Sequence, residues 1–294
     1  MARRLGVPFV LTPFLHLGDP HDANDRTRRI YLSPAMMSLA RAADRMFVQT
    51  EVEREALIAK GISDWKIVLQ GLGVDLNSCT GGNRQRARAE WGVTDDDVVI
   101  GHLANNSREK GSVDLLRAAE RAWAKGHRFQ LVFAGPEMPN FRQFWKGYCS
   151  THRVRRLGIL DDGQKKDFFA GINVFAMPSR SDSFGLVFLE AWANGVPNVA
   201  YRAGGVAGVI RHETDGLLVK CGDVDGLAQA LARISCDANL RRQFGESGRA
   251  RLARDYEWND KLTLVERVYA DLTSHVQTEK ARSSRKETLA GASG

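Results

Sequence analysis

The residues with the clearest capacity for chemistry are two carboxylates, Asp182 and Glu190, at the two ends of a glycine-containing segment. An apolar run ends at Met177, a loop with Gly185 follows, and helical spacing begins near Leu186. Backbone amides are unpaired at the start of a helix and a glycine lets a ligand approach them, so the loop suits phosphate oxygens. The second carboxylate lies about one helical turn later, where it suits a ribose diol. An ordinary strand–helix loop with a solvated glutamate fits the same residues equally well.

A lysine and a histidine stand in two further loops of this kind. Lys110 precedes a glycine in the segment 105–111, between an apolar run and a helical pattern. Its ammonium group would stabilise the negative charge that develops on a departing diphosphate. Arg108 supplies a second cation in the same loop, and a solvated charge at the helix start is the alternative for it. His16 follows the first apolar run, and a loop histidine without a functional role is its alternative.

Short apolar runs must position these loops. They lie at residues 9–12, 45–49, 66–69, 98–101, 130–133, 174–177 and 197–200. Most of them are followed by about ten to twenty residues with helical spacing, which predicts a parallel sheet with helices on both faces. The predicted fold class is therefore α/β, with a doubly wound parallel sheet. Ligands bind at the carboxyl ends of the strands in such sheets, which is where Lys110, Asp182 and His16 fall.

Local signals also predict boundaries. Thr50 and Glu53 have the spacing of a capping box, which predicts a helix start. Residues 223–272 have the pattern of three successive helices, and Gly, Asn, Ser and Thr cluster at 73–88, where we expect a domain boundary. The last residues contain almost nothing apolar, so they cannot offset the entropy of ordering. The expected division is a domain at 1–80, a domain at 81–255, a crossing helix at 256–274 and a disordered tail at 275–294.

The motifs around the two carboxylates resemble those of retaining glycosyltransferases of family 4, which have the two-domain GT-B fold. The stretch P-S-x-x-D-S-F-G-L-V-x-L-E-A-W-A-N-G-V-P, from Pro178, resembles the signature loop of that family, and Gly204-Gly205 follows it. The first acid is Asp182 where the family usually has Glu, so its reach is one methylene shorter. Segment 105–111 resembles the family's R-x-x-x-E-K-G, but the arginine is missing, and Asn105 or His102 stands at its place.

The resemblance implies a role for each candidate residue. Asp182 would contact the transferred sugar and Lys110 the diphosphate, with His16 near the reaction centre; these three are the expected catalytic residues. Glu190 would bind the ribose, backbone amides after Asp182 would meet the diphosphate, and the segment around Ile159 would meet the base. The expected nucleotide-sugar-binding residues are Glu190, Ser183, Phe184, Gly185, Leu186, Val187, Ile159, Gly204, Gly205 and Arg108.

The resemblance covers about residues 8–272 and implies one complete Rossmann-like domain behind an incomplete N-terminal one, whose first strands and glycine-rich loop are not in the sequence. It implies retaining transfer of a sugar from a UDP- or GDP-sugar to a hydroxyl acceptor, which is a saccharide, a lipid or a small molecule. No cofactor or metal is expected, and His102, His127, His152 and His212 show no i, i+4 spacing among themselves. A catalytically inactive nucleotide-sugar-binding fragment or partner subunit is the alternative.

Composition narrows the class of protein. Of 294 residues, 43% are hydrophobic and 26% charged, which excludes a disordered or fibrous chain. The net charge of +7 suits an anionic partner, but no recognition motif or stacking platform predicts nucleic acid. The four cysteines stand far apart and are expected to be isolated buried thiols. No apolar run is long enough to span a bilayer, so a cytoplasmic location is expected. The aromatic and basic segment 141–146 leaves contact with the inner face of a membrane open.

Overall fold

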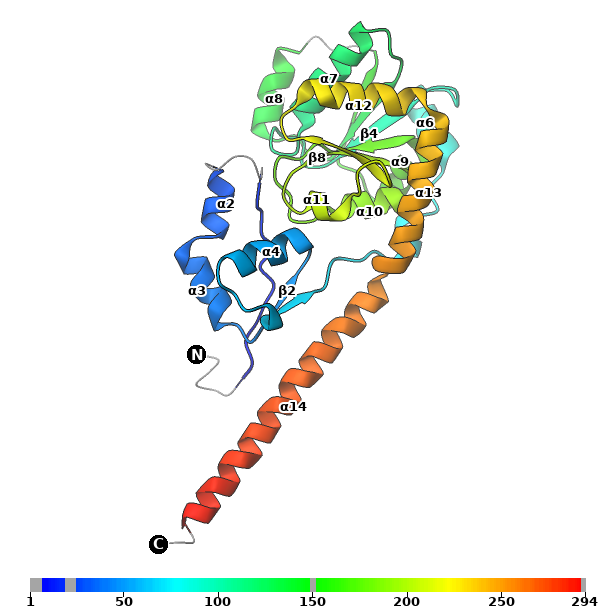
Figure 1. Ribbon diagram of the computed structural model, residues 1–294. Coiled ribbons are helices and arrows are strands. Elements are labelled where there is room, and N and C mark those ends of the chain that lie inside the picture. Colours follow the sequence, from blue (N-terminus) through cyan, green and yellow to red (C-terminus); the bar gives the residue numbers. More distant parts are fainter. Residues whose placement is uncertain (1–6, 19–24, 149–151, 292–294) are drawn as a thin grey trace.

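The computed structural model describes residues 7–18, 25–148 and 152–291, with side chains up to residue 274. It shows two α/β units and a long C-terminal helix (Figure 1). The N-terminal unit has a parallel sheet in the order β1-β2-β3, and its core lies between this sheet and its helices. The strands are β1 (Val10–Leu11), β2 (Arg45–Val48) and β3 (Ile67–Leu69). The helices are α2 (Arg26–Tyr31), α3 (Pro34–Ala42), α4 (Glu51–Ala59) and the short 3-10 helix η1 (Asp64–Lys66).

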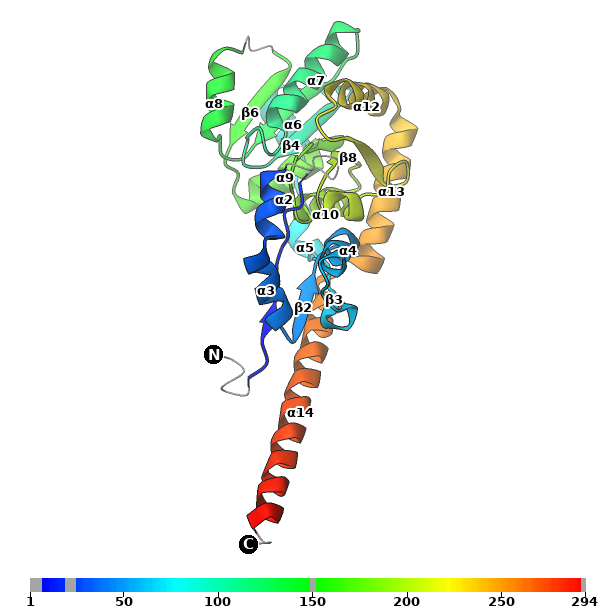
Figure 2. The ribbon, with the colours of Figure 1, turned by 60° about the vertical axis from the view of Figure 1, so that its left-hand side comes forward.

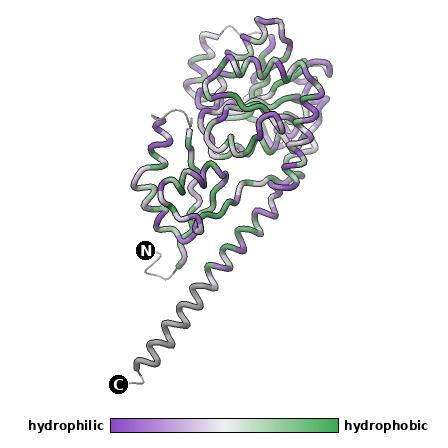
Figure 3. The backbone as a smooth tube through the Cα atoms, in the orientation of Figure 1, coloured by the Kyte–Doolittle hydropathy of each residue, from purple (hydrophilic) through white to green (hydrophobic). Residues whose placement is uncertain are grey.

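The C-terminal unit has a six-stranded parallel sheet in the order β6-β5-β4-β7-β8-β9. Its strands are β4 (Val99–Leu103), β5 (Gln130–Ala134), β6 (Val154–Gly158), β7 (Val174–Ala176), β8 (Asn198–Arg202) and β9 (Gly216–Lys220). The central strands are green, and so hydrophobic, in Figure 3. From β4 the chain proceeds outwards through β5 and β6, and it then returns to the other side of β4 with β7. The order of the strands therefore reverses between β4 and β7, and this is where an open α/β sheet forms its ligand crevice.

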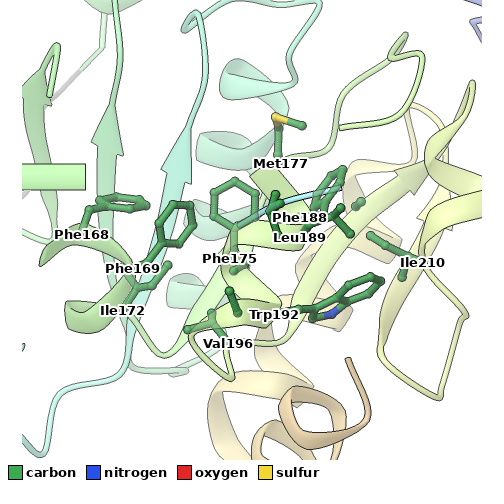
Figure 4. Close-up of a cluster of buried hydrophobic side chains, with 14 of the residues drawn as sticks. Phe168, Phe169, Ile172, Phe175, Met177, Phe188, Leu189, Trp192, Val196 and Ile210 are labelled. Atoms are coloured by element: carbon green, nitrogen blue, oxygen red, sulfur yellow. The ribbon is translucent and has the colours of Figure 1, made fainter. Parts of the chain in front are cut away.

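Helices cover both faces of this sheet. They are α6 (Arg84–Trp91), α7 (Ser112–Ala124), α8 (Pro139–Lys146), α9 (Asp162–Gly171), α10 (Leu186–Ala193), α11 (Val206–Val209), α12 (Val224–Cys236) and α13 (Ala238–Asp255). One buried cluster lies under α7 and α12, and another under α9 and α10. In the second cluster the ring of Phe175 on β7 lies 5.8 Å from Phe169 and 5.7 Å from Phe188 (Figure 4). These ring contacts fix the start of α10 relative to the end of β7.

The two units are joined twice. A linker with α5 (Leu76–Cys79) leads into the C-terminal unit, and α14 (Trp258–Gly291) crosses back along the N-terminal unit (Figures 1 and 2). The backbone N–H of Val74 donates to the carbonyl of Tyr256 at 3.1 Å, and the rings of Phe47 and Tyr269 lie 6.3 Å apart. The crossing chain is therefore held against both the linker and β2.

The seven predicted strands and the α/β fold class are confirmed, and several details differ. Strand β6 was not predicted because only its first residue is buried and the others alternate between partly buried and exposed; β9, at the other edge of the sheet, was also missed. The predicted disordered tail differs from the structure, in which α14 continues to Gly291. Ala, Glu, Lys and Arg are frequent there, and their high helix propensity favours this. Among the described residues, no helix is both long and apolar enough to cross a membrane.

Two local expectations need correction. Thr50 Oγ1 accepts from the backbone N–H of Glu53 at 3.2 Å, but the Glu53 carboxylate does not complete the capping box. It accepts from the backbone N–H groups of Leu15 at 2.7 Å and Gln49 at 2.6 Å, because it is buried between β2 and the first loop. The thiols are also less buried than expected. Cys79 and Cys221 are half-buried and Cys236 is exposed at the end of α12, while Cys149 lies outside the described residues.

Candidate active site

Two loops lie at the reversal of strand order, one between β4 and α7 and one between β7 and α10. They interlock closely, since a Cβ atom at Gly111 would lie 2.5 Å from the carbonyl carbon of Pro178. The backbone N–H of Arg180 donates to the carbonyl of Glu109 at 2.8 Å, and Ser179 Oγ donates to the same oxygen at 3.3 Å. The two loops therefore form one rigid framework at the carboxyl edge of the sheet.

This framework brings Lys110 and Asp182 together. Lys110 Nζ lies 2.6 Å from Asp182 Oδ2, and Asp182 is only 7% exposed. Both side chains line a cavity of about 300 Å³ at the start of α10. The predicted binding residues on its wall are Ser183, Phe184, Gly185, Leu186 and Val187. The cavity thus combines an ammonium group, a carboxylate and the first turn of a helix, whose amide groups lack partners within the helix.

Phe184 lines the cavity and also packs into the buried core. Its ring lies 5.8 Å from the ring of Tyr256 and is 1% exposed. The helix then begins at Leu186 after Gly185, whose φ of +85° is a conformation that favours glycine.

His16 belongs to the N-terminal unit and interacts electrostatically with this pair. Burial lowers the pKa of its half-buried imidazole; the negative charge of Asp182 opposes this, and the positive charge of Lys110 adds to it. The imidazole therefore lies within electrostatic range of both groups. Nearby, the carbonyl of Gly18 accepts a hydrogen bond from the backbone N–H of Gly204 at 2.7 Å. The three residues expected to be catalytic from the sequence thus lie around one place.

The glycine pair after β8 supports the Asp182 loop. The backbone N–H of Gly205 donates to the carbonyl of Asp182 at 2.8 Å. A Cβ atom at Gly205 would lie 2.5 Å from the carbonyl carbon of Ser183, and one at Gly204 would lie 3.2 Å from the amide nitrogen of Asp182. Gly204 and Gly205 are therefore packed against the backbone of the loop, and they are not among the described residues that line the cavity.

Glu190 lies in a second hollow, which shares no lining residue with the cavity of Lys110 and Asp182. Its Oε1 atom is 2.6 Å from Lys165 Nζ of α9, and the Glu190 side chain is 16% exposed. The hollow has a volume of about 300 Å³, and Cys79 and Ser78 of α5 also line it. Lys165 and Cys79 were not identified from the sequence, because no local pattern connects either of them with Glu190.

Three further predicted positions lie outside the cavity. Arg108 is exposed; its backbone N–H donates to Asn140 Oδ1 at 3.3 Å, and its backbone carbonyl accepts from the N–H of Gly111 at 3.1 Å. Ile159 follows β6 and is 75% exposed. His102, at the place of the family's arginine, is a core residue whose ring nitrogens lie 2.8 Å from the Ala176 carbonyl and 2.9 Å from Ser112 Oγ. Burial lowers its pKa to about 4, so it is neutral and supplies no positive charge to the site.

The described side chains include no group of three or more His, Cys, Asp or Glu placed to hold a metal ion. Metal independence therefore stays a prediction from the resemblance.

The chain is similar in sequence to known glycosyltransferases. The chain is 32% identical over 219 residues to a D-inositol 3-phosphate glycosyltransferase of Kribbella flavida, covering 70% of this chain and 51% of that protein. It is 30% identical over 186 residues to the N-acetyl-alpha-D-glucosaminyl L-malate synthase of Bacillus anthracis, covering 63% and 48%. The chain thus spans about half the length of these curated relatives.

Solved structures show the same fold. The sucrose-phosphate synthase of Thermosynechococcus elongatus matches with a TM-score of 0.76 at 25% identity, over 92% of this chain and 69% of that one. Anabaena HepE in complex with UDP and glucose matches with a TM-score of 0.75 at 21% identity, over 93% and 73%. Residues 1–73 match a glycosyl transferase 4-like domain, and residues 83–251, more than half of the chain, match glycosyl transferases group 1. The chain therefore belongs to the glycosyl transferases group 1 family and has the GT-B fold.

Proposed function

We propose that this protein transfers a sugar from a nucleotide-diphosphate sugar to a hydroxyl acceptor with retention of configuration. The observation that carries the proposal is the contact of Lys110 with Asp182 at 2.6 Å, on a cavity that also receives the first turn of α10. Cationic and amide donors beside a carboxylate suit a ligand that joins a diphosphate to a sugar, because the first group is an anion and the second is rich in hydroxyls.

The residues divide the reaction between them. An ammonium group donates three hydrogen bonds, so Lys110 can hold the Asp182 carboxylate and a phosphate oxygen together. The bond from the anomeric carbon to the diphosphate breaks, and the diphosphate leaves with the electron pair. The acceptor oxygen bonds to that carbon from the same side, and its proton passes to the leaving phosphate. Lys110 and the α10 amides stabilise the departing charge, while Asp182 orients the sugar through its hydroxyls.

Glu190 has a separate part in this proposal. Its carboxylate lies about one helical turn beyond the diphosphate-binding amides, in the adjoining hollow, where it accepts from the hydroxyls of the nucleotide ribose. The UDP complexes of HepE support a nucleoside diphosphate as ligand for this fold. The names of the curated relatives support sugar transfer as the reaction.

The test measures calorimetric binding of UDP and GDP, and then donor hydrolysis and sugar transfer, by the purified chain. Lys110→Ala should weaken nucleotide binding by about 10- to 100-fold, because it removes a charged hydrogen-bond donor. If the purified chain binds neither UDP nor GDP, this result contradicts the donor assignment. Binding without turnover favours the alternative of an inactive nucleotide-sugar-binding fragment or partner subunit.

We further propose that the reaction needs no divalent metal and that the protein acts in the cytoplasm or at the inner face of the membrane. Turnover should then survive dialysis against EDTA, and loss of turnover that is restored by Mg²⁺ or Mn²⁺ contradicts metal independence. Cell fractionation that places the protein outside the cytoplasm and inner membrane contradicts the location.

A further inference from the structure

Helix α2 is positively charged and contributes no buried side chain to the core of the N-terminal unit. It has three arginines in six residues, Arg26, Arg28 and Arg29, and it buries none of its side chains. Within the described part of the chain, none of these three guanidinium groups has an acidic partner. Figure 3 shows the helix mostly in hydrophilic colours. Three cations on one short helix, with no acidic partner among the described side chains, form a local site of positive potential.

One face of α2 lies against the loop that carries His16. The ring of Tyr31 is 5.5 Å from the imidazole of His16. Arg28 precedes Tyr31 by three residues, so both project from the same face of the helix. Arg28 is half-buried, whereas Arg26 and Arg29 are exposed. A partly desolvated cation interacts more strongly with an anion than an exposed one does, so Arg28 is the strongest anion ligand of the three.

The beginning of α2 is fixed to the same loop. Asp25 Oδ1 accepts from the backbone N–H of Arg28 at 2.8 Å, and a Cβ atom at Gly18 would lie 2.8 Å from the same oxygen. Gly18 also bonds Gly204 of the other unit. Figures 1 and 2 both show α2 at the end of the N-terminal unit that faces the C-terminal unit. The arginines thus border the place where Lys110, Asp182 and His16 meet.

We propose that α2 binds an anionic group of the acceptor, a phosphate or a carboxylate, and so selects acceptors that carry one. The proposal rests on the transfer reaction proposed above, since it specifies the acceptor of that reaction. Guanidinium groups bind both anions through paired, charge-assisted hydrogen bonds. The diphosphate of the donor has its own partners in Lys110 and the first turn of α10, which belong to the other unit. The charge on α2 therefore serves a second anion, on the side of the N-terminal unit.

The test distinguishes binding of an anion at α2 from binding of the donor nucleotide. Calorimetry measures binding of glycerol 3-phosphate, and of glycerol as its neutral counterpart, to the protein alone and to the protein saturated with UDP or GDP. Because a lipid headgroup presents the same phosphate, a parallel arm measures co-sedimentation with phosphatidylglycerol and phosphatidylcholine vesicles. The variant combines Arg28→Gln with Arg29→Gln. Arg249→Gln is the matched control, because Arg249 is an exposed arginine on α13.

The wild type should bind glycerol 3-phosphate or phosphatidylglycerol vesicles in preference to the neutral counterpart. The α2 variant should bind the anion about 10- to 100-fold more weakly than the wild type, while the affinity of the control variant changes by less than about twofold. Nucleotide affinity should stay unchanged in both variants. Binding of glycerol 3-phosphate identifies a soluble phosphate as the ligand, whereas binding of vesicles alone identifies a lipid headgroup; both outcomes support the anion site.

Equal anion binding by the wild type and the α2 variant overturns the proposal, as does the absence of binding in both arms. Loss of nucleotide affinity in the α2 variant also overturns it, because the arginines would then serve the donor. If the wild type binds neither UDP nor GDP, the donor assignment fails instead. In that case, the comparison of anion binding by the wild type and the α2 variant without nucleotide still tests whether α2 binds an anion.

Discussion

Replacing Gly205 with alanine should displace the loop that carries Asp182. Gly205 has an ordinary helical backbone with a φ of −69°, so alanine brings no backbone strain of its own. Its Cβ atom would nevertheless lie 2.5 Å from the carbonyl carbon of Ser183 and 3.2 Å from the amide nitrogen of Phe184. Carbon atoms in contact stay about 3.5–4.0 Å apart, so the loop must retreat by about 1 Å.

This displacement of the loop should move Asp182 relative to Lys110. The Asp182 carbonyl accepts from the Gly205 amide at 2.8 Å, and Asp182 Oδ2 lies 2.6 Å from Lys110 Nζ. A misplacement of about 1 Å near the reacting groups lowers turnover by about a hundredfold. Forcing extra atoms into a packed region also lowers the free energy of unfolding by about 1–3 kcal/mol. We expect both losses in Gly205→Ala, with a smaller loss of nucleotide affinity, since Glu190 lies in a separate hollow.

The assay combines urea unfolding, calorimetric titration with UDP or GDP, and sugar transfer. Gly147→Ala is the matched control, because Gly147 also has a negative φ, −97°, and a Cβ atom there would meet nothing closer than 3.9 Å. That substitution should be neutral or stabilise the fold by up to about 1 kcal/mol. If Gly205→Ala behaves like the control in turnover and in unfolding free energy, the glycine pair does not hold the Asp182 loop, and the reasoning is refuted.

Three further predictions concern single side chains. Glu190→Ala should lower the affinity for UDP or GDP by about 10- to 100-fold, and an unchanged calorimetric affinity contradicts the ribose assignment. Asp182→Asn keeps the shape of the side chain but removes its charge, so turnover should fall by about a hundredfold or more while the protein stays folded by circular dichroism. His102 has a pKa lowered to about 4 by burial, so its neutral form stabilises the fold fully above its unfolded pKa of about 6.5. This stability is lost as the pH falls from about 6.5 towards about 4, by about 2 kcal/mol between about pH 7.5 and about pH 5, and urea unfolding of His102→Gln should lack that loss.

The location of Lys110 and Asp182 at the same edge of the sheet is predictable from sequence, although 72 positions separate them. Each residue follows a parallel strand, and the carboxyl ends of such strands share one edge. The neighbourhood of β4 and β7 was not predictable, because alternating strands and helices do not specify the order of strands. The edge strand β6 was missed for a related reason. It pairs on one side only, and Arg156 lies exposed within it, so it lacks a continuous apolar run.

The surroundings of Glu190 show a second kind of contact that the sequence does not predict. The sequence places Glu190 near Asp182 through the spacing of one motif, but the structure puts them in two hollows that share no lining residue. The Lys165 partner of Glu190 comes from another strand–helix unit, and no local pattern predicts such a contact. The packing of Gly205 on Ser183 is likewise a tertiary contact, which no local pattern predicts.

The same glycine pair also joins the two halves of the reaction centre. The amide of Gly204 donates to the Gly18 carbonyl at 2.7 Å, and the amide of Gly205 donates to the Asp182 carbonyl at 2.8 Å. One dipeptide therefore sets the position of the His16 loop relative to the Asp182 loop. The proposed nucleotide ligands all belong to the C-terminal unit, whereas His16 and the arginines of α2 belong to the N-terminal unit. Nucleotide binding and turnover should consequently respond to different degrees: a change at the border of the units lowers turnover more than nucleotide affinity, whereas a change in the α10 region lowers both.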